Sequence, residues 1–134
     1  PKGVICNHIG PVNMIAFDWI VHQNESRSNI VGCSAPFVFD MFMHGFFGTL
    51  GVGAIFSLDL KNCTVVECTP SIAPLLLGDA KNGEVHTLLV GGEACPQGLD
   101  KSVCHLRNTY GPTEASIQAS CSHSSSTIGR PLPN

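Results

Sequence analysis

The chain has 134 residues, of which 43% are hydrophobic and 13% charged, and its formal net charge is −3 at pH 7. This composition indicates a globular chain with a buried core and excludes a disordered one. The small negative charge and the lack of a basic cluster argue against nucleic acid or a membrane surface as partner. The apolar runs are interrupted by Asp40, His44 and several glycines, so no membrane span is predicted.

The number and spacing of the cysteines indicate a reducing cellular compartment. The seven cysteines are odd in number and include no Cys-x-x-Cys pair, so neither a disulfide framework nor a zinc site is expected. Most are predicted to be buried, as small hydrophobic residues in a reducing compartment. No targeting pattern follows Pro1, and we expect a cytoplasmic protein.

The first third of the chain predicts a loop, a helix and a strand. Lys2 before a glycine can close a phosphate-binding loop, although a solvated terminal lysine is the alternative. Gly10 and Pro11 can begin a helix that ends near residues 22–24, followed by a polar loop at 24–29. Residues 30–35 are apolar and favour a strand buried on both faces.

Residues 37–50 are hydrophobic all round, which predicts a buried helix. Asp40 within this run is unfavourable unless a donor or a cation satisfies its carboxylate. Two partners remain open at this point. One is a backbone N–H at the start of the helix, because Asp is a good N-cap residue, and the other is a bound cation.

The remaining segments alternate between strands, helices and turns. We expect a turn and short strand in 51–58, strands at 64–68, 85–90, 103–107 and 115–120, helices at 69–77 and 96–102, a turn at 81–83 and a flexible loop at 123–126. Gly91 and Gly92 follow directly after one strand, where a flat ligand can lie against the backbone of an open α/β sheet. A simple strand-to-helix turn is the alternative.

The stretch Asn108–Glu114 concentrates chemical groups around a predicted turn. Gly111 and Pro112 favour the turn because glycine tolerates dihedrals that other residues do not. The ring of Tyr110 can stack on a base, the hydroxyl of Thr113 can bond a phosphate, and the carboxylate of Glu114 can hold Mg²⁺. An ordinary surface turn over a packed tyrosine is the alternative.

Several short phrases, in this order, resemble motifs of the adenylation domains of nonribosomal peptide synthetases, within the adenylate-forming enzymes. They are Pro1–His8, Phe39-Asp40, Thr69–Ser71, Gly91–Ala94, Asn108–Glu114 and Ile128–Asn134. The resemblance implies an α/β fold, part of the large N-terminal subdomain, with a mostly parallel sheet flanked by helices. It also implies that residues 1–134 are a partial domain that lacks the front of the phosphate loop, a helix-sized segment after Leu58 and the C-terminal subdomain. We expect the isolated chain to be inactive.

The same resemblance implies an activity. Members of the family use ATP and Mg²⁺ to convert a carboxylic acid into an acyl-adenylate and pyrophosphate. The acyl group then passes to the phosphopantetheine thiol of a neighbouring carrier domain, which works beside a condensation domain. Two alternatives are an acyl- or aryl-CoA ligase of the same superfamily and a non-catalytic nucleotide-binding module.

Site residues follow from the resemblance, motif by motif. Tyr110 would stack on adenine, and Asn108 would contact the base or brace the turn. Thr113 would bond the α-phosphate and Glu114 would hold Mg²⁺, which makes these two the expected catalytic residues. The other expected nucleotide-binding residues are Lys2, Gly91, Gly92, Glu93, Ala94 and Gly111.

The resemblance also implies an amino-acid site. Asp40 would pair with the substrate ammonium. The side-chain pocket would be formed by Met41, His44, Glu67, Leu89, Gly91, Thr109, Ile117 and Gln118. The polar residues among them favour a basic or hydrogen-bonding amino acid. For Glu67, the alternative is a strand-edge residue that faces water.

Overall fold

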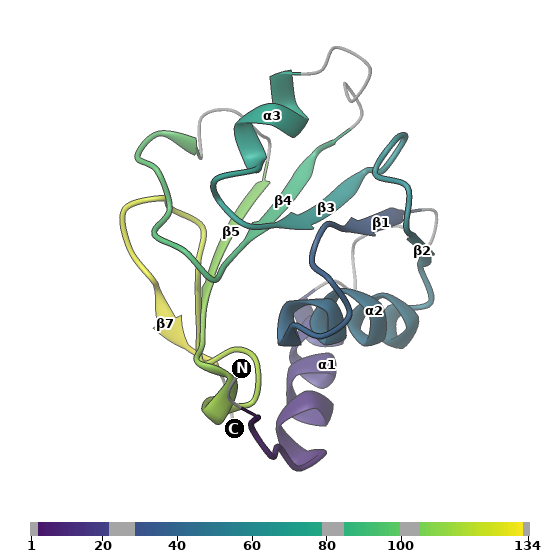
Figure 1. The fold of residues 1–134 in the computed structure, drawn as a ribbon, viewed down its shortest axis with the longest axis vertical. Helices are drawn as coiled ribbons and strands as arrows, with labels where there is room; N and C mark the ends of the chain where they lie inside the picture. The colour runs from purple at the N-terminus through teal and green to yellow at the C-terminus, as the bar shows by residue number, and fades with distance from the viewer. Residues whose placement is uncertain (1–2, 22–28, 79–84, 100–104, 133–134) are drawn as a thin grey trace.

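The computed structural model describes residues 3–21, 29–78, 85–99 and 105–132 (Figure 1). Its helices are α1 (Ile9–Val21), α2 (Asp40–Val52), α3 (Ala73–Gly78) and the 3₁₀ turn η3 (Thr113–Ala115). Its strands are β1 (Ile30–Cys33), β2 (Ile55–Ser57), β3 (Val65–Cys68), β4 (Thr87–Val90), β5 (His105–Tyr110), β6 (Ser120–Ser122) and β7 (Arg130–Pro131).

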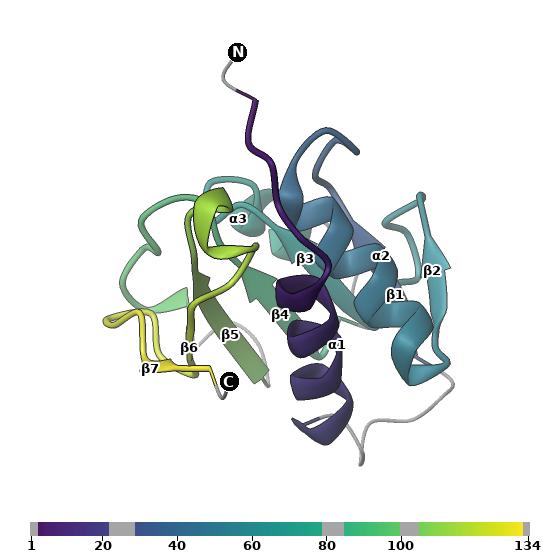
Figure 2. The same cartoon turned by 90° about the horizontal axis from the view of Figure 1, so that it is seen from below.

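The described strands form one seven-stranded sheet in the order β2-β1-β3-β4-β5-β6-β7. The pairs from β2 to β5 are parallel, and the last two pairs are antiparallel. Helices α1 and α2 lie on one face of the sheet and α3 lies on the other (Figures 1 and 2). The predicted α/β fold with a mostly parallel sheet flanked by helices is therefore confirmed.

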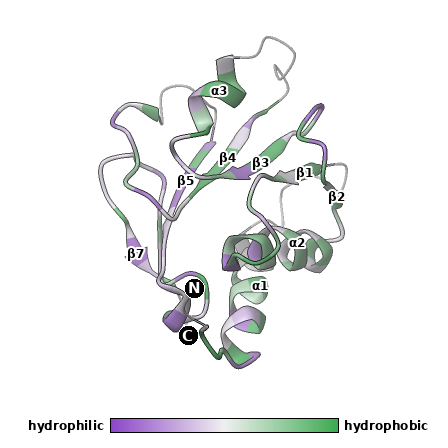
Figure 3. Ribbon diagram, viewed as in Figure 1, coloured by the Kyte–Doolittle hydropathy of each residue, from purple (hydrophilic) through white to green (hydrophobic). Residues whose placement is uncertain are grey.

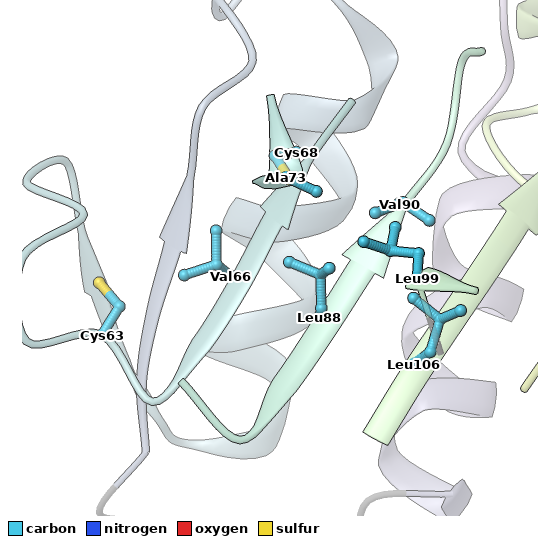
Figure 4. Packing of buried hydrophobic residues seen from close by; sticks show 8 residues of the cluster. All are labelled: Cys63, Val66, Cys68, Ala73, Leu88, Val90, Leu99 and Leu106. Carbon is cyan, nitrogen blue, oxygen red and sulfur yellow. The ribbon is translucent and has the colours of Figure 1, made fainter. Parts of the chain in front are cut away.

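The core lies between the sheet and α3. Every second residue of β3, β4 and β5 points to this side, because successive strand side chains alternate between the two faces. The cluster consists of Cys63, Val66, Cys68, Ala73, Leu88, Val90, Leu99 and Leu106 (Figure 4). In Figure 3, β4, α2 and α3 are largely hydrophobic, whereas β7 and parts of β3 and β5 are hydrophilic.

Cysteines contribute to this core less than the sequence suggests. Three of the six described cysteines are buried, whereas Cys6 is exposed and Cys95 and Cys121 are partly exposed. Within the described residues, each helix is too short or too polar to cross a lipid bilayer.

The predicted strands at 30–35, 64–68 and 85–90 are confirmed, and so is the helix that starts at Gly10 and Pro11. The start of α1 is stabilised by Asn7, whose side-chain oxygen accepts a hydrogen bond from the Ile9 N–H at 3.0 Å. The expected ends of this helix near 22–24, the loop from 24 to 28 and the turn at 81–83 lie outside the described residues. Residues 100–102 of the helix expected at 96–102 also lie outside the described residues, and residues 96–99 form a turn rather than an α-helix.

The helix expected at 37–50 is shifted and only half buried. It begins at Asp40 and continues to Val52, where Gly53 ends it in the left-handed conformation with φ of 74°. Phe37, Val38 and Phe39 precede it and are exposed, as are Met43, Phe47 and Leu50 on its outer face. The expectation of burial all round was wrong because α2 packs on the sheet along one side.

The short strand expected at 115–120 was also wrong. Ser116 and Ile117 adopt positive φ angles of 62° and 82°, which break an extended chain. The strand begins only at Ser120. In contrast, β5 extends beyond the expected end at 107 and includes Asn108, Thr109 and Tyr110.

Candidate functional site

A pocket of about 490 Å³ opens at the carboxyl ends of β4 and β5. The parallel register aligns these ends, since Val90 lies opposite Asn108. Ligands bind at this edge in open α/β sheets. The pocket is lined by Gly92, Glu93, Ala94, Cys95, Asn108, Thr109, Tyr110, Gly111, Pro112 and Ile128. The structure thus brings together the two motifs that the sequence placed around one nucleotide.

The two glycines after β4 are required for different reasons. A Cβ atom on Gly91 would lie 2.7 Å from the Thr109 Oγ1 and 3.5 Å from the Met41 Cε, so a side chain has no room. Gly92 has a φ of 81°, which disfavours side-chain-bearing residues. Three residues of the expected substrate pocket, Met41, Gly91 and Thr109, are therefore neighbours. The Thr109 hydroxyl donates to the Val90 carbonyl at 3.0 Å, which holds that side chain against Gly91.

Tyr110 and Asn108 have different roles on β5. Tyr110 lines the pocket and is 51% exposed, so its ring can receive a flat ligand. Asn108 is buried, and its amide donates to the Thr127 carbonyl at 2.9 Å and to the Ser124 carbonyl at 3.5 Å. These bonds hold the predicted loop at 123–126 against the end of β5.

Gly111 is required by close packing rather than by its dihedral angles. Its φ lies outside the left-handed region, contrary to the reason that the sequence suggested. An added Cβ would clash with the Ile117 carbonyl and would lie 2.6 Å from the Gln118 Cα and 2.8 Å from the Ala119 nitrogen. The segment 116–119 therefore folds directly over Gly111. This brings Ile117 and Gln118, two expected pocket residues, to the end of β5.

The residues expected to bind the two substrates meet at the start of α2. The Thr113 hydroxyl donates to the Asp40 Oδ2 at 2.6 Å, across 73 positions of sequence. Phe39, not Asp40, occupies the N-cap position, so the N-cap interpretation of Asp40 was wrong. The carboxylate is satisfied by a side chain from η3, which also carries the exposed Glu114.

The N-terminal segment, residues 3–10, also contacts η3 and the residue that follows it. The thiol of Cys6 donates to the Thr113 carbonyl at 3.2 Å. Gly10, near the start of α1, packs so closely on Ser116 that an added Cβ would clash with the serine side chain. The segment that resembles the phosphate loop thus ends beside Thr113, while Lys2 itself lies outside the described residues.

A buried histidine–glutamate pair lies further inside, between α2 and the sheet. The His44 Nδ1 and the Glu67 Oε1 are 2.7 Å apart, and each side chain is 4% exposed. A Cβ on Gly45 would lie 2.6 Å from the Glu67 Oε2, so the glycine makes room for the carboxylate. The water-facing interpretation of Glu67 was wrong, because β3 lies in the interior of the sheet between β1 and β4.

The electrostatic effect of Glu67 extends to two thiols. Burial raises the pKa of Cys33 to about 12, and the charge of Glu67 contributes to this rise. Burial raises the pKa of Cys68 to about 12 as well, again with a contribution from Glu67. Both thiols remain protonated at neutral pH, so neither is a nucleophile in this state.

Several residues expected to form the side-chain pocket are neighbours along α2 and the strands beneath it. Met41 and His44 are three positions apart and share a helix face. Leu89 lies opposite Glu67 in the strand register and is buried. A chain of neighbours therefore runs from Gly91 through Met41 and His44 to Glu67.

Some lining residues were not predicted from the sequence. Cys95 directly follows the Gly91–Ala94 motif and Pro112 lies within Asn108–Glu114, but neither was assigned a binding role from the sequence. Ile128 comes from the connection before β7, where the Ser120 hydroxyl donates to its carbonyl at 2.8 Å. The resemblance of residues 128–134 to a family phrase was the signal that could have identified it. Glu93 has a structural contact too, since its carboxylate accepts from the Ser71 N–H at 3.3 Å.

Comparison with known proteins agrees with this arrangement. The family model described as "AMP-binding enzyme" matches residues 1–134. The AMB antimetabolite synthetase AmbE of Pseudomonas aeruginosa is 30% identical over all of this chain and 8% of its own length. Nonribosomal peptide synthetase 32 of Fusarium pseudograminearum is 30% identical over 97% of this chain and 2% of its own length. The delta-poly-L-ornithine synthetase of Acinetobacter baumannii is 37% identical over 58% of this chain and 6% of its own length.

Solved structures share the fold. The nonribosomal peptide synthetase FmoA3 with AMPPNP bound has a TM-score of 0.81 at 19% identity, over 98% of this chain and 18% of that chain. A four-domain nonribosomal peptide synthetase bound to AMP and glycine has a TM-score of 0.79 at 24% identity, over 98% of this chain and 12% of that chain.

The chain corresponds to only a small part of each of these relatives. It spans between 2% and 10% of the length of the curated relatives it matches. The match to AmbE extends over 164 positions, which is 30 more than the 134 residues of the chain. At least 30 positions of that alignment therefore have no counterpart in this chain. The chain belongs to the AMP-binding enzyme family and is part of an adenylation domain of the nonribosomal peptide synthetase type.

Proposed function

We propose that the chain is part of a domain that activates an amino acid with ATP. A carboxylate oxygen of the amino acid attacks the α-phosphorus, the bond to the β-phosphate oxygen breaks, and pyrophosphate leaves. The aminoacyl group then passes to the phosphopantetheine thiol of a carrier domain, and AMP leaves. The observation that carries this proposal is the contact of Asp40 with Thr113 beside the pocket. An ammonium-binding acid and a phosphate-binding hydroxyl lie where the two substrates must meet.

The nucleotide fits the pocket at the ends of β4 and β5. Its volume of about 490 Å³ lies within the usual range for small-molecule sites. Tyr110 stacks on adenine, and the backbone of Gly91–Ala94 forms the wall of the adenine site. Asn108 shapes the site through the loop that it holds, and Lys2 supplies charge to the phosphates. The similar structures with AMPPNP or AMP bound support this assignment.

Glu114 is the residue that would hold Mg²⁺. Magnesium prefers oxygen ligands and is commonly held by one or two carboxylates together with substrate phosphates. The exposed carboxylate of Glu114, one residue from Thr113, meets this requirement. When bound, Mg²⁺ neutralises charge on the phosphates. Thr113 contributes its hydroxyl to the α-phosphate, which supports the transition state by positioning and charge stabilisation.

The amino-acid side chain extends from Asp40 toward the His44–Glu67 pair. The carboxylate of Glu67 and the imidazole of His44 offer a charge and a hydrogen bond in a dry environment, where such interactions are strong. A basic or hydrogen-bonding side chain satisfies them better than an apolar one. The name of the similar polyornithine synthetase agrees with a basic substrate. Ile117 and Gln118 complete the pocket from the segment over Gly111.

Amino-acid-dependent exchange of pyrophosphate into ATP tests the proposal in the full synthetase that carries this chain. We expect exchange with one or a few polar amino acids, with L-ornithine and L-glutamine as the first probes. Exchange only with fatty or aromatic acids would instead identify an acyl- or aryl-CoA ligase. Nucleotide binding without any exchange would identify a non-catalytic module.

The chain functions within a larger assembly in this proposal. Its relatives are much longer. We expect the front of the phosphate loop and the C-terminal subdomain in the rest of the synthetase. Carrier and condensation domains of the same synthetase are its partners. The flanking gene sequence tests this point, because a carrier domain with a phosphopantetheine-bearing serine should follow the adenylation domain.

A further inference from the structure

Two side chains that are proposed to bind different substrates are hydrogen-bonded to each other. Thr113 is the first residue of η3, and its hydroxyl donates to the carboxylate of Asp40, the first residue of α2, at 2.6 Å. We infer that this hydrogen bond couples the two substrates, so that each of them increases the affinity of the site for the other. The inference rests on the proposed function, which assigns Asp40 to the ammonium and Thr113 to the phosphate.

The coupling follows from the number of hydrogens available. A threonine hydroxyl carries one hydrogen, so Thr113 can donate either to Asp40 or to a phosphate oxygen, but not to both. Nucleotide binding therefore removes the donor from Asp40. The half-buried carboxylate then lacks a hydrogen-bond donor, and the substrate ammonium can supply one.

Binding of the amino acid should likewise increase the affinity of the site for the nucleotide. An ammonium at Asp40 neutralises the carboxylate and weakens its hold on the Thr113 hydroxyl, which becomes available to the phosphate. The two effects are necessarily equal in equilibrium binding, because coupling between two sites is reciprocal. A charge-assisted hydrogen bond is strong enough to produce a measurable effect.

The backbone around Thr113 permits this exchange without moving the helix. The Thr113 carbonyl accepts the Ser116 N–H at 3.0 Å and the Cys6 thiol at 3.2 Å. The Ala115 N–H is bonded to the Pro112 carbonyl at 2.8 Å. These bonds hold η3 in place, so rotation about one side-chain bond of Thr113 is sufficient to redirect its hydroxyl.

A purely structural tie between α2 and η3 gives a different expectation. Loss of the hydroxyl would then lower the stability and would leave the mutual effect of the substrates unchanged. If the bond instead couples the two substrates, loss of the hydroxyl should change the affinity for the amino acid in the absence of nucleotide. Without the hydroxyl, Asp40 has no competing donor, so the amino acid alone should bind more tightly in Thr113→Val than in the unmodified protein.

Isothermal titration calorimetry on the full synthetase tests the inference. The probes are L-ornithine or L-glutamine, whichever supports exchange, and α,β-methylene-ATP, which cannot release pyrophosphate. In the unmodified protein we expect the analogue to tighten amino-acid binding by about tenfold. In Thr113→Val the amino acid should bind several-fold tighter without the analogue, and the enhancement should disappear. Thr113→Ser keeps the hydroxyl and should keep the enhancement.

The outcomes separate the two levels of the account. Enhancement that persists in Thr113→Val, or that is absent from the unmodified protein when both probes bind, would overturn the coupling alone. Failure of every amino acid to bind or exchange would overturn the proposed function instead. If Thr113→Val does not melt at a temperature close to that of the unmodified protein, Thr113→Ala replaces it, and the same results are required.

Discussion

At the scale of single residues, close packing explains several identities in the site. Gly45 leaves space for the Glu67 carboxylate, Gly91 for the Thr109 side chain, and Gly111 for the backbone of 117–119. Each of these glycines lies next to a residue with a proposed role in binding. The shape of the site therefore depends on the space that these glycines leave free as well as on the side chains that line it.

Substitution of Gly111 tests this explanation. Gly111→Ala should destabilise the domain by about 1–3 kcal/mol, because the new methyl group requires the 116–119 segment to move. It should also raise the KM for ATP, since Gly111 lines the pocket. Scanning calorimetry and steady-state kinetics on the full synthetase measure both effects.

Gly78→Ala is the matched control for Gly111. A Cβ at Gly78 would meet none of the other described atoms within 4 Å. Its unfolding transition and its KM for ATP should remain close to those of the unmodified protein. Equal effects of the two substitutions would contradict the packing explanation.

The charge of Glu67 is the second quantity to test at this scale. Glu67→Gln keeps the shape and removes the charge. If L-ornithine is the substrate, its KM should rise by about tenfold or more, because a charge-assisted hydrogen bond contributes about 1.5–3 kcal/mol. The KM for ATP should not change, since Glu67 lies away from the nucleotide pocket. An unchanged KM for the amino acid, measured by pyrophosphate exchange, would remove Glu67 from the substrate pocket.

At the scale of elements, the central parallel strands were the most predictable part. Residues 64–68 and 85–90 are short apolar runs, and burial on both sides of a parallel sheet selects such runs. The start of α2 was less predictable. Phe37–Phe39 continue the apolar pattern of the helix, but their backbone forms a turn in which the Phe39 N–H bonds to the Pro36 carbonyl at 2.9 Å. Hydrophobicity alone does not mark that boundary.

The prediction of a strand at 115–120 was wrong because local sequence preference does not decide the structure there either. Composition favours an extended chain there, whereas the fold requires the segment to return over Gly111 in a tight path. The positive φ of Ser116 and Ile117 is the local consequence. Long-range packing overrides local preference at this point, and a single sequence carries little information about it.

The core strand β4 gives a prediction at the element scale. Leu88 is 0% exposed within the cluster between the sheet and α3. Leu88→Ala should lower the free energy of unfolding by about 2–5 kcal/mol through lost burial and a residual cavity. Leu75, on α3, is 75% exposed, and Leu75→Ala should change the stability by less than about 0.5 kcal/mol. Similar melting temperatures for the two variants would contradict the assigned core.

At the scale of the whole molecule, the site depends on contacts between distant segments. The motifs at 91–94 and 108–114 could be assigned to one pocket from the sequence, because both resemble family motifs that line the adenine site. The bond between Asp40 and Thr113 could not, since it depends on how α2 is placed by the β1-α2-β2 connection. The buried pairing of His44 with Glu67 depends on the same placement.

The most direct test of the account is amino-acid-dependent pyrophosphate exchange by the full synthetase with Asp40→Asn. Loss of the charge partner for the ammonium should reduce kcat/KM for the amino acid by about a hundredfold or more. Asp59→Asn is the control, because Asp59 is exposed in the turn after β2 and its acceptor for the Lys61 N–H is retained in asparagine. It should exchange at the unmodified rate. Exchange by Asp40→Asn at the rate of Asp59→Asn would contradict the central claim that Asp40 binds the substrate ammonium.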